Sequence, residues 1–281
     1  MTQPLHSRLL TDLAPPDIQE YLASGKDTII IPLGSVEMHG YHCPLGTDIY
    51  NAMEVSKRAA EKAGVLYGPP IWTGYSPQHL REPENGMGTL TFRGETVRAV
   101  IYDTTRSLVH HGFNRIIFAN GHTSNTKVTD EVFRRLRYET GALLGMFKPY
   151  GERYLGIIDD LMENPEEETP GWHAIMMAYR KENVNMERAV TAEGHAPAWL
   201  PESFKKNDAN PDASFKGYEY FYFPMDHDEM ADHGVIGNPF RATAEKGEQI
   251  FDRFSTYLAE AIAELETVKV NIHQRAFDLK A

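Results

Sequence analysis

Acidic and imidazole side chains follow two apolar, strand-like runs of this chain. After the run at 27–33 the sequence reads GSVEMHG, which contains Glu37 and His39, and Asp48 follows nine residues after His39. In an extended chain, residues two apart point to the same side, so Glu37 and His39 can face one site. Asp48 stands where a helix is expected to begin, and a carboxylate there is either a helix cap or a rigidly held ligand. This segment alone leaves both interpretations open.

The second cluster follows the run at 115–119 and reads NGHTSN, with His122 behind Gly121. A glycine permits a sharp turn at the strand end. Taken alone, such a histidine is often only a hydrogen-bonded structural residue. The two clusters together supply two carboxylates and two imidazoles, a donor set that suits zinc or manganese. A carboxylate that bridges two cations about 3.5–4 Å apart is the arrangement of hydrolytic two-metal sites.

The elements that must position these residues alternate between strand and helix. The patterns predict strands at 27–33, 65–70, 115–119 and 142–147, and helices at 10–23, 48–63, 96–111, 125–140, 171–180 and 241–265. Such alternation indicates an α/β fold with a mostly parallel sheet. Ligands of these sheets gather where the strands end. Both polar clusters are expected at that edge.

Composition narrows the class of protein. The chain has 281 residues, of which 28 are basic and 40 are acidic. The resulting net charge of −12 argues against a nucleic-acid partner. The single cysteine, Cys43, excludes an internal disulfide and a thiolate zinc cage. No apolar run approaches the ~20 residues of a membrane span, and no secretory signal is visible. We therefore expect an acidic cytoplasmic protein of one domain, residues 1–281, with 201–235 as an elaborated lid or an oligomer contact.

The motifs GSVEMHG, PLGTD and NGHTSN, with GVIGNP at 234–239, resemble the creatininase (creatinine amidohydrolase) family. The resemblance runs from about residue 28 to 262. It implies a three-layer α/β sandwich, in which helices flank a mostly parallel central sheet. It also implies two divalent metal ions per subunit (Zn, Mn or Fe), a small-molecule substrate, and a homo-oligomer that can be a hexamer.

When the family's ligands are carried over motif by motif, the resemblance implies that Asp48 bridges the two cations. Glu37 and His122 complete one metal site and His39 helps to hold the other. The last ligand departs from the pattern, because creatininase has a glutamate two residues after the histidine of the Asn-Gly-His turn and Ser124 stands there in this chain. We take His173 as the hypothetical last ligand, the alternative being a packed histidine at a helix start.

The family's catalytic histidine, which would donate a proton to the leaving group, also has no clear counterpart in this chain. His195, in EGHA, is preferred to Glu168 in the acidic loop, although either can be an ordinary surface residue. His79, Trp172 and Trp199 are candidates to line the substrate pocket, since indole faces suit flat or ring-shaped ligands. Trp199 can equally be a core residue.

The resemblance implies hydrolysis of a C–N bond in a cyclic amide, with a metal-activated water as nucleophile. The altered ligand at Ser124 and an expanded segment at 81–87 indicate a substrate other than creatinine. Alternatives within the family are C–C hydrolysis that opens a diketo-cyclitol ring and deformylation of a linear amide. An alternative of a different class is a non-catalytic, metal-free binding relative.

Overall fold

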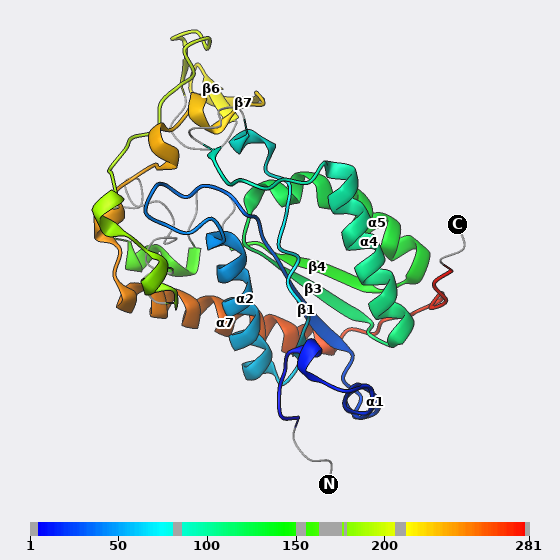
Figure 1. Cartoon of the computed structure of the whole chain (residues 1–281). Coiled ribbons are helices and arrows are strands. Elements are labelled where there is room, and N and C mark those ends of the chain that lie inside the picture. Colours follow the sequence, from blue (N-terminus) through cyan, green and yellow to red (C-terminus); the bar gives the residue numbers. More distant parts are fainter. Residues whose placement is uncertain are drawn as a thin grey trace.

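The computed structural model describes residues 5–80, 86–149, 156–162, 176, 179–205 and 212–278. Its centre is a four-stranded sheet with helices on both faces (Figure 1). The strands are β1 (Thr28–Leu33), β2 (Leu66–Tyr67), β3 (Arg115–Asn120) and β4 (Leu143–Phe147). Their order is β2-β1-β3-β4 and every pair is parallel, so the α/β prediction is confirmed.

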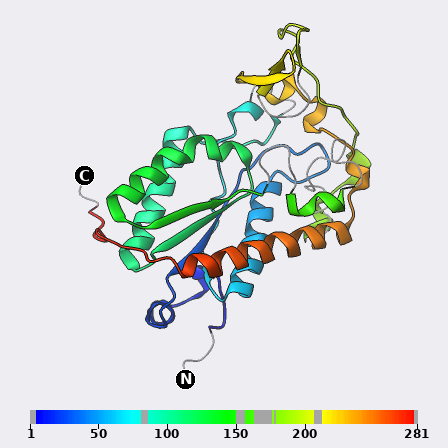
Figure 2. The same ribbon diagram turned by 180° about the vertical axis from the view of Figure 1, so that it is seen from behind.

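The helices form two layers on either side of this sheet. Helices α2 (Thr47–Ala63) and α7 (Ala244–Glu266) cover one face, and α4 (Gly94–His111) and α5 (Thr126–Thr140) cover the other (Figures 1 and 2). A further helix, α1 (Pro15–Ala23), precedes β1. The chain therefore has the three-layer architecture that the family resemblance implies.

Strand periodicity divides the core between the two faces. Ile30 and Ile117 are register partners and belong to the apolar cluster of α2 and α7. Their neighbours Ile29 and Ile116 belong to the cluster of α4 and α5 on the opposite face. Successive side chains of a strand point to opposite faces, so a run of apolar residues fills both layers at once. All six residues of β1 and of β3 are buried.

A second, smaller sheet projects from the main body (Figures 1 and 2). It is antiparallel and consists of β5 (Phe204–Lys205), β6 (Asp212–Phe215) and β7 (Tyr218–Tyr222). The sequence patterns predicted no strand within 201–235, whereas Phe204 pairs with Phe215 and Phe215 pairs with Tyr218 across these strands. The helix predicted at 171–180 falls almost wholly outside the described residues.

Two glycines allow the first turn of α2 to approach the ends of β1 and β3. A Cβ on Gly121 would lie 2.1 Å from the Asp48 carbonyl oxygen, and one on Gly34 would lie 2.5 Å from the Ile49 Cα. Any larger residue would push the helix away from the sheet edge. The glycines thus fix Asp48 between the two strand ends. Among the described helices, none combines the length and the apolar character needed to cross a membrane.

Candidate metal centre

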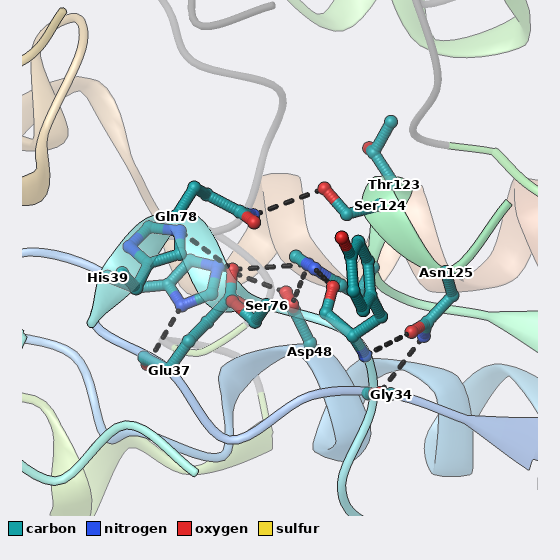
Figure 3. A network of polar contacts seen from close by, with 12 residues as sticks. Gly34, Glu37, His39, Asp48, Ser76, Gln78, Thr123, Ser124 and Asn125 are labelled. Carbon is teal, nitrogen blue, oxygen red and sulfur yellow. Dashed lines mark hydrogen bonds and ion pairs between the residues drawn. The ribbon is translucent and has the colours of Figure 1, made fainter. Parts of the chain in front are cut away.

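Four acidic and imidazole side chains from three separate segments converge beyond the ends of β1 and β3 (Figure 3). His122 Nδ1 lies 3.1 Å from Glu37 Oε1 and 3.0 Å from Asp48 Oδ2. His39 Nε2 lies 3.0 Å from the other Asp48 oxygen, Oδ1. The structure therefore brings together Glu37, His39, Asp48 and His122, the residues that the two sequence clusters offered.

The strand ends are tied together by two asparagine amides. Asn125 donates from Nδ2 to the Gly34 carbonyl at 3.1 Å and to Asn120 Oδ1 at 3.0 Å. Asn120 in turn donates to the His122 carbonyl at 2.7 Å. Asn125 Oδ1 also accepts the backbone N–H of Tyr75 at 2.9 Å, which draws a third loop to the site. These bonds hold the turn that carries His122 against the end of β1.

Backbone carbonyls orient both imidazoles toward the carboxylates. A carbonyl oxygen can only accept, so His122 donates from Nε2 to Tyr75 at 3.1 Å, and His39 donates from Nδ1 to Glu37 at 3.4 Å. The opposite ring nitrogens, His122 Nδ1 and His39 Nε2, then face the carboxylate oxygens. This pairing of one ring nitrogen with a carbonyl fixes the tautomer of a metal-binding histidine.

Glu37 has further neighbours that fix its carboxylate. The Ser76 hydroxyl donates to Oε2, and His79 Nε2 lies 3.4 Å from Oε1. Although burial raises the pKa of Glu37, His122 and His79 hold that pKa well below its usual range. Glu37 is therefore an anion, and each of its two carboxylate oxygens has a named partner.

The two imidazoles facing the carboxylates have raised pKa values. Burial alone would lower the pKa of His39, but the Asp48 carboxylate outweighs burial and raises this pKa to about 9. Burial also lowers the pKa of His122, and Glu37 and Asp48 raise it to about 10. In the metal-free protein these rings hold protons at neutral pH in the positions where a cation would sit.

The donor set fits a divalent cation. One oxygen or nitrogen from each of Glu37, His39 and Asp48 lies within 4.8 Å of the other two. Asp48 is 1% exposed, and within the described part of the chain no backbone N–H or hydroxyl group donates to either of its oxygens. Buried carboxylate oxygens are commonly satisfied by such donors. Each Asp48 oxygen instead faces a different imidazole.

A cavity of about 530 Å³ opens above these residues. The site residues and the loops after β1 and β3 form its floor. Its opposite wall comes from the chain after β6, with Tyr222, His227, Met230 and Val235. The cavity is large enough for a small ring compound.

The other predicted site residues are placed differently. His79 lines the cavity, whereas His195 and Trp199 are not part of its described lining. The His195 side chain is 43% exposed and lies 3.7 Å from Asp232. Trp199 is 51% exposed and donates to Glu229. Glu168, Trp172 and His173 lie outside the described residues, as do 81–85 of the segment at 81–87.

The cavity residues that sequence reasoning missed include His227, Lys127 and Tyr222. His227 stacks on His79 with ring centroids 4.5 Å apart. Burial, and then the neighbouring His79, lower the pKa of His227 to about 3, so the ring is neutral. Nothing in the local sequence marks His227 or Tyr222, because each reaches the cavity only through the packing of the small sheet. Lys127 lies five residues after His122, and that proximity was the available signal.

Comparison with known proteins decides the family. The family model described as creatinine amidohydrolase matches residues 11–262. This chain belongs to the creatininase family. It is 28% identical over 260 residues to the creatinine amidohydrolase of Pseudomonas putida, covering 86% of this chain and 91% of that protein.

Solved structures and other relatives agree. A mutant creatininase of "Zn-Zn type" matches with a TM-score of 0.70 and 25% identity, over 94% of this chain and all of that one. The 3-dehydro-scyllo-inosose hydrolase of Thermotoga maritima is 26% identical, over 85% of this chain and 78% of that protein. A mycofactocin precursor peptide peptidase of Mycobacterium tuberculosis is 30% identical, over 82% of both. These creatininase-family relatives are hydrolases, and the family's members depend on metal ions.

Proposed function

We propose that this chain hydrolyses the C–N bond of a small cyclic amide other than creatinine, using two divalent metal ions per subunit. The observation that carries the proposal is the position of Asp48, whose two buried oxygens face the imidazoles of His39 and His122. A purely structural aspartate at a helix start would accept hydrogen bonds from backbone N–H groups instead.

The proposed ligands divide into two sets that share Asp48. Glu37 and His122 would hold one cation with Asp48, and His39 would hold the second. Zinc, manganese and iron all suit such a mixture of imidazole and carboxylate. Bound cations would polarise the carbonyl group of the substrate and make hydroxide available at neutral pH. His173 stays a prediction for the last ligand, as does Glu168 for the proton donor.

The remaining residues of the floor would orient the ligands and exclude water. Ser76 and His79 fix the Glu37 carboxylate, and the Tyr75 carbonyl fixes His122. His195 is not included in the proposed machinery, because its side chain lies outside the cavity lining. The cavity would hold a ring compound against this floor. Ser124 accepts a hydrogen bond from Gln78 and supplies no carboxylate.

The test combines metal analysis with a substrate panel. The protein, purified without chelators, should contain two equivalents of zinc, manganese or iron by plasma mass spectrometry. It should hydrolyse members of a cyclic-amide panel, and chelation should abolish that hydrolysis. Turnover of formamides alone would replace the cyclic amide with a linear amide, and turnover of oxidised cyclitols alone would replace C–N hydrolysis with C–C hydrolysis. A metal-free protein that hydrolyses nothing would favour a binding relative and contradict the proposal.

We also propose that the chain acts in the cytoplasm as a homo-oligomer, a hexamer being the form expected for the family. The support is β7, whose side chains are all exposed, with Tyr220 82% accessible. Exposed aromatic patches commonly mark contacts between proteins. In analytical ultracentrifugation, Tyr220→Ser should shift the protein toward smaller species. Tyr138→Ser, at a tyrosine that is 69% exposed on α5, should not. Equal sedimentation of both variants and the wild type would exclude this contact.

A further inference from the structure

Lys127 brings a positive charge to the cavity. It is the second residue of α5 and lines the cavity on the side of the loop that carries His122. Its ammonium group lies 5.1 Å from the ring centroid of Tyr222 on β7. Lys127 of α5 and Tyr222 of β7 therefore connect the helical layer of the main body with the small sheet. A cation over a tyrosine ring is held by the ring electrons, which fixes the direction of the side chain.

No anion of the described chain is paired with this ammonium. Among the described cavity-lining residues, Lys127 is the only lysine or arginine. The ion pairs found among the described residues do not include Lys127. Burial lowers the pKa of Lys127, and the charge of Asp212 opposes this with a smaller effect. A partly desolvated ammonium group gains more from an opposite charge than an ammonium group in water does.

Two neutral hydrogen-bonding groups stand beside Lys127. Ser124 precedes it by three residues, a spacing that places both on one face of a helical turn. Gln78 donates from Nε2 to Ser124 Oγ at 3.1 Å. The Ser124 oxygen accepts this bond and keeps its own hydroxyl proton, which can donate to a ligand. Lys127, Ser124 and Gln78 all line the cavity, and they form a wall that offers donors and one positive charge.

We propose that Lys127 determines substrate specificity by binding a carboxylate of the substrate, so that the substrate class is a cyclic amide that carries an acidic group. This inference rests on the proposed function, which places the amide carbonyl at the floor of the same cavity. One ammonium group balances the single charge of a carboxylate, whereas a phosphate would bring close to two charges. Creatinine-like neutral rings would leave Lys127 without a partner.

The experiment compares two probes that differ by one charge. They are 2-pyrrolidone-5-carboxylate and 2-pyrrolidone-5-carboxamide, cyclic amides of nearly equal shape. Their dissociation constants are measured by calorimetry or ligand-observed NMR with zinc-loaded and with metal-free protein at low salt. The variants are Lys127→Met, Lys127→Arg and, as a charge-matched control, Lys269→Met, which removes an exposed lysine outside the cavity lining.

We expect the wild type to bind the carboxylate at least about tenfold more tightly than the carboxamide, with or without zinc. Lys127→Met should reduce this ratio to about one while leaving carboxamide affinity within about twofold. Lys127→Arg should keep part of the preference, and Lys269→Met should behave as the wild type does. The preference should also weaken as salt is added, because screening reduces the interaction between the two charges.

Several results would overturn the assignment. One is a preference that survives in Lys127→Met, and another is equal or absent binding of both probes by the wild type. A preference that disappears when zinc is removed would assign the carboxylate to the metals rather than to Lys127. In contrast, a protein that binds no metal and hydrolyses nothing, yet keeps the Lys127-dependent preference, would contradict the proposed function alone.

Discussion

The cavity has a floor and an opposite wall, and the chain builds them in different ways. The floor lies at the ends of β1 and β3, where Glu37, Asp48 and His122 are all buried and each has defined neighbours. The wall comes from β7 and the turns after it, where Tyr222 is 54% exposed although Met230 and Val235 are buried. A rigid sheet edge can hold reacting groups in fixed geometry, whereas the turns outside the sheet are where residues that select a ligand are commonly found. We therefore assign chemistry to the floor and selection to the wall and to Lys127.

The largest effect should follow removal of the shared charge at the floor. Asp48→Asn should lose both metal ions and reduce turnover by on the order of 10³-fold or more, because an amide cannot bridge two cations. Metal analysis and steady-state kinetics check this, with Asp103→Asn at an exposed position of α4 as the control. If Asp48→Asn keeps two metal ions and its activity, Asp48 does not bridge the metal ions.

Metal binding should displace protons from the floor. Because His39 and His122 have pKa values of about 9 and 10, both are protonated in the metal-free protein at pH 7. A cation must replace both protons, so about two should be released on binding. The apparent zinc affinity should then fall by up to about 100-fold per pH unit as the pH is lowered from 8 to 6.

Calorimetry in buffers of different ionisation enthalpy measures the protons released. The pH dependence of the zinc affinity should flatten only above the raised pKa values of His39 and His122, where both rings are already neutral. An affinity independent of pH between 6 and 8 would show that the two imidazoles are not ligands.

A smaller effect is expected from the group that holds a ligand in place. Ser76→Ala removes the hydroxyl that donates to Glu37 Oε2. Loss of such a supporting hydrogen bond typically weakens metal affinity by about 10–100-fold. Ser107→Ala is the matched control, since Ser107 is an exposed residue of α4 whose hydroxyl donates to a backbone carbonyl. Competition with a chromophoric chelator measures both affinities, and equal values would show that Ser76 has no positioning role.

The smallest effect should come from the wall. His227→Phe keeps an aromatic ring to stack on His79 but removes both ring nitrogens. We expect KM to rise by about threefold to tenfold, with metal content unchanged and kcat within about twofold. Steady-state kinetics with a substrate identified from the panel checks this. Loss of metal from His227→Phe would instead place the wall within the metal centre and remove the contrast drawn above.

The same contrast explains how much the sequence could predict. Periodicity predicted β1, β3 and the flanking helices to within a few residues, since buried parallel strands and amphipathic helices leave clear patterns. Glu37, His39 and Asp48 were predictable because they lie close together in sequence after one strand. His122 could be joined to them because parallel strand ends meet at one edge.

The wall was not predictable by the same means. The antiparallel pairing of β6 with β7 brings Tyr222 and His227 to the cavity, and this long-range packing leaves no local signal. His195 was preferred from a His-Ala pair, but the isolated bridge between Gly194 and Ala231 holds that segment where the His195 ring remains exposed and near Asp232. Motif likeness alone therefore did not bring His195 into the described cavity lining, and its role as proton donor stays a prediction.

Anomalous X-ray diffraction from crystals grown with zinc or manganese tests the central claim most directly. We predict two peaks in each chain about 3.5–4 Å apart. One should be bounded by Glu37, Asp48 and His122, and the other by His39 and Asp48. Crystals that show no peak beside Asp48, or peaks only at other parts of the surface, would contradict the account.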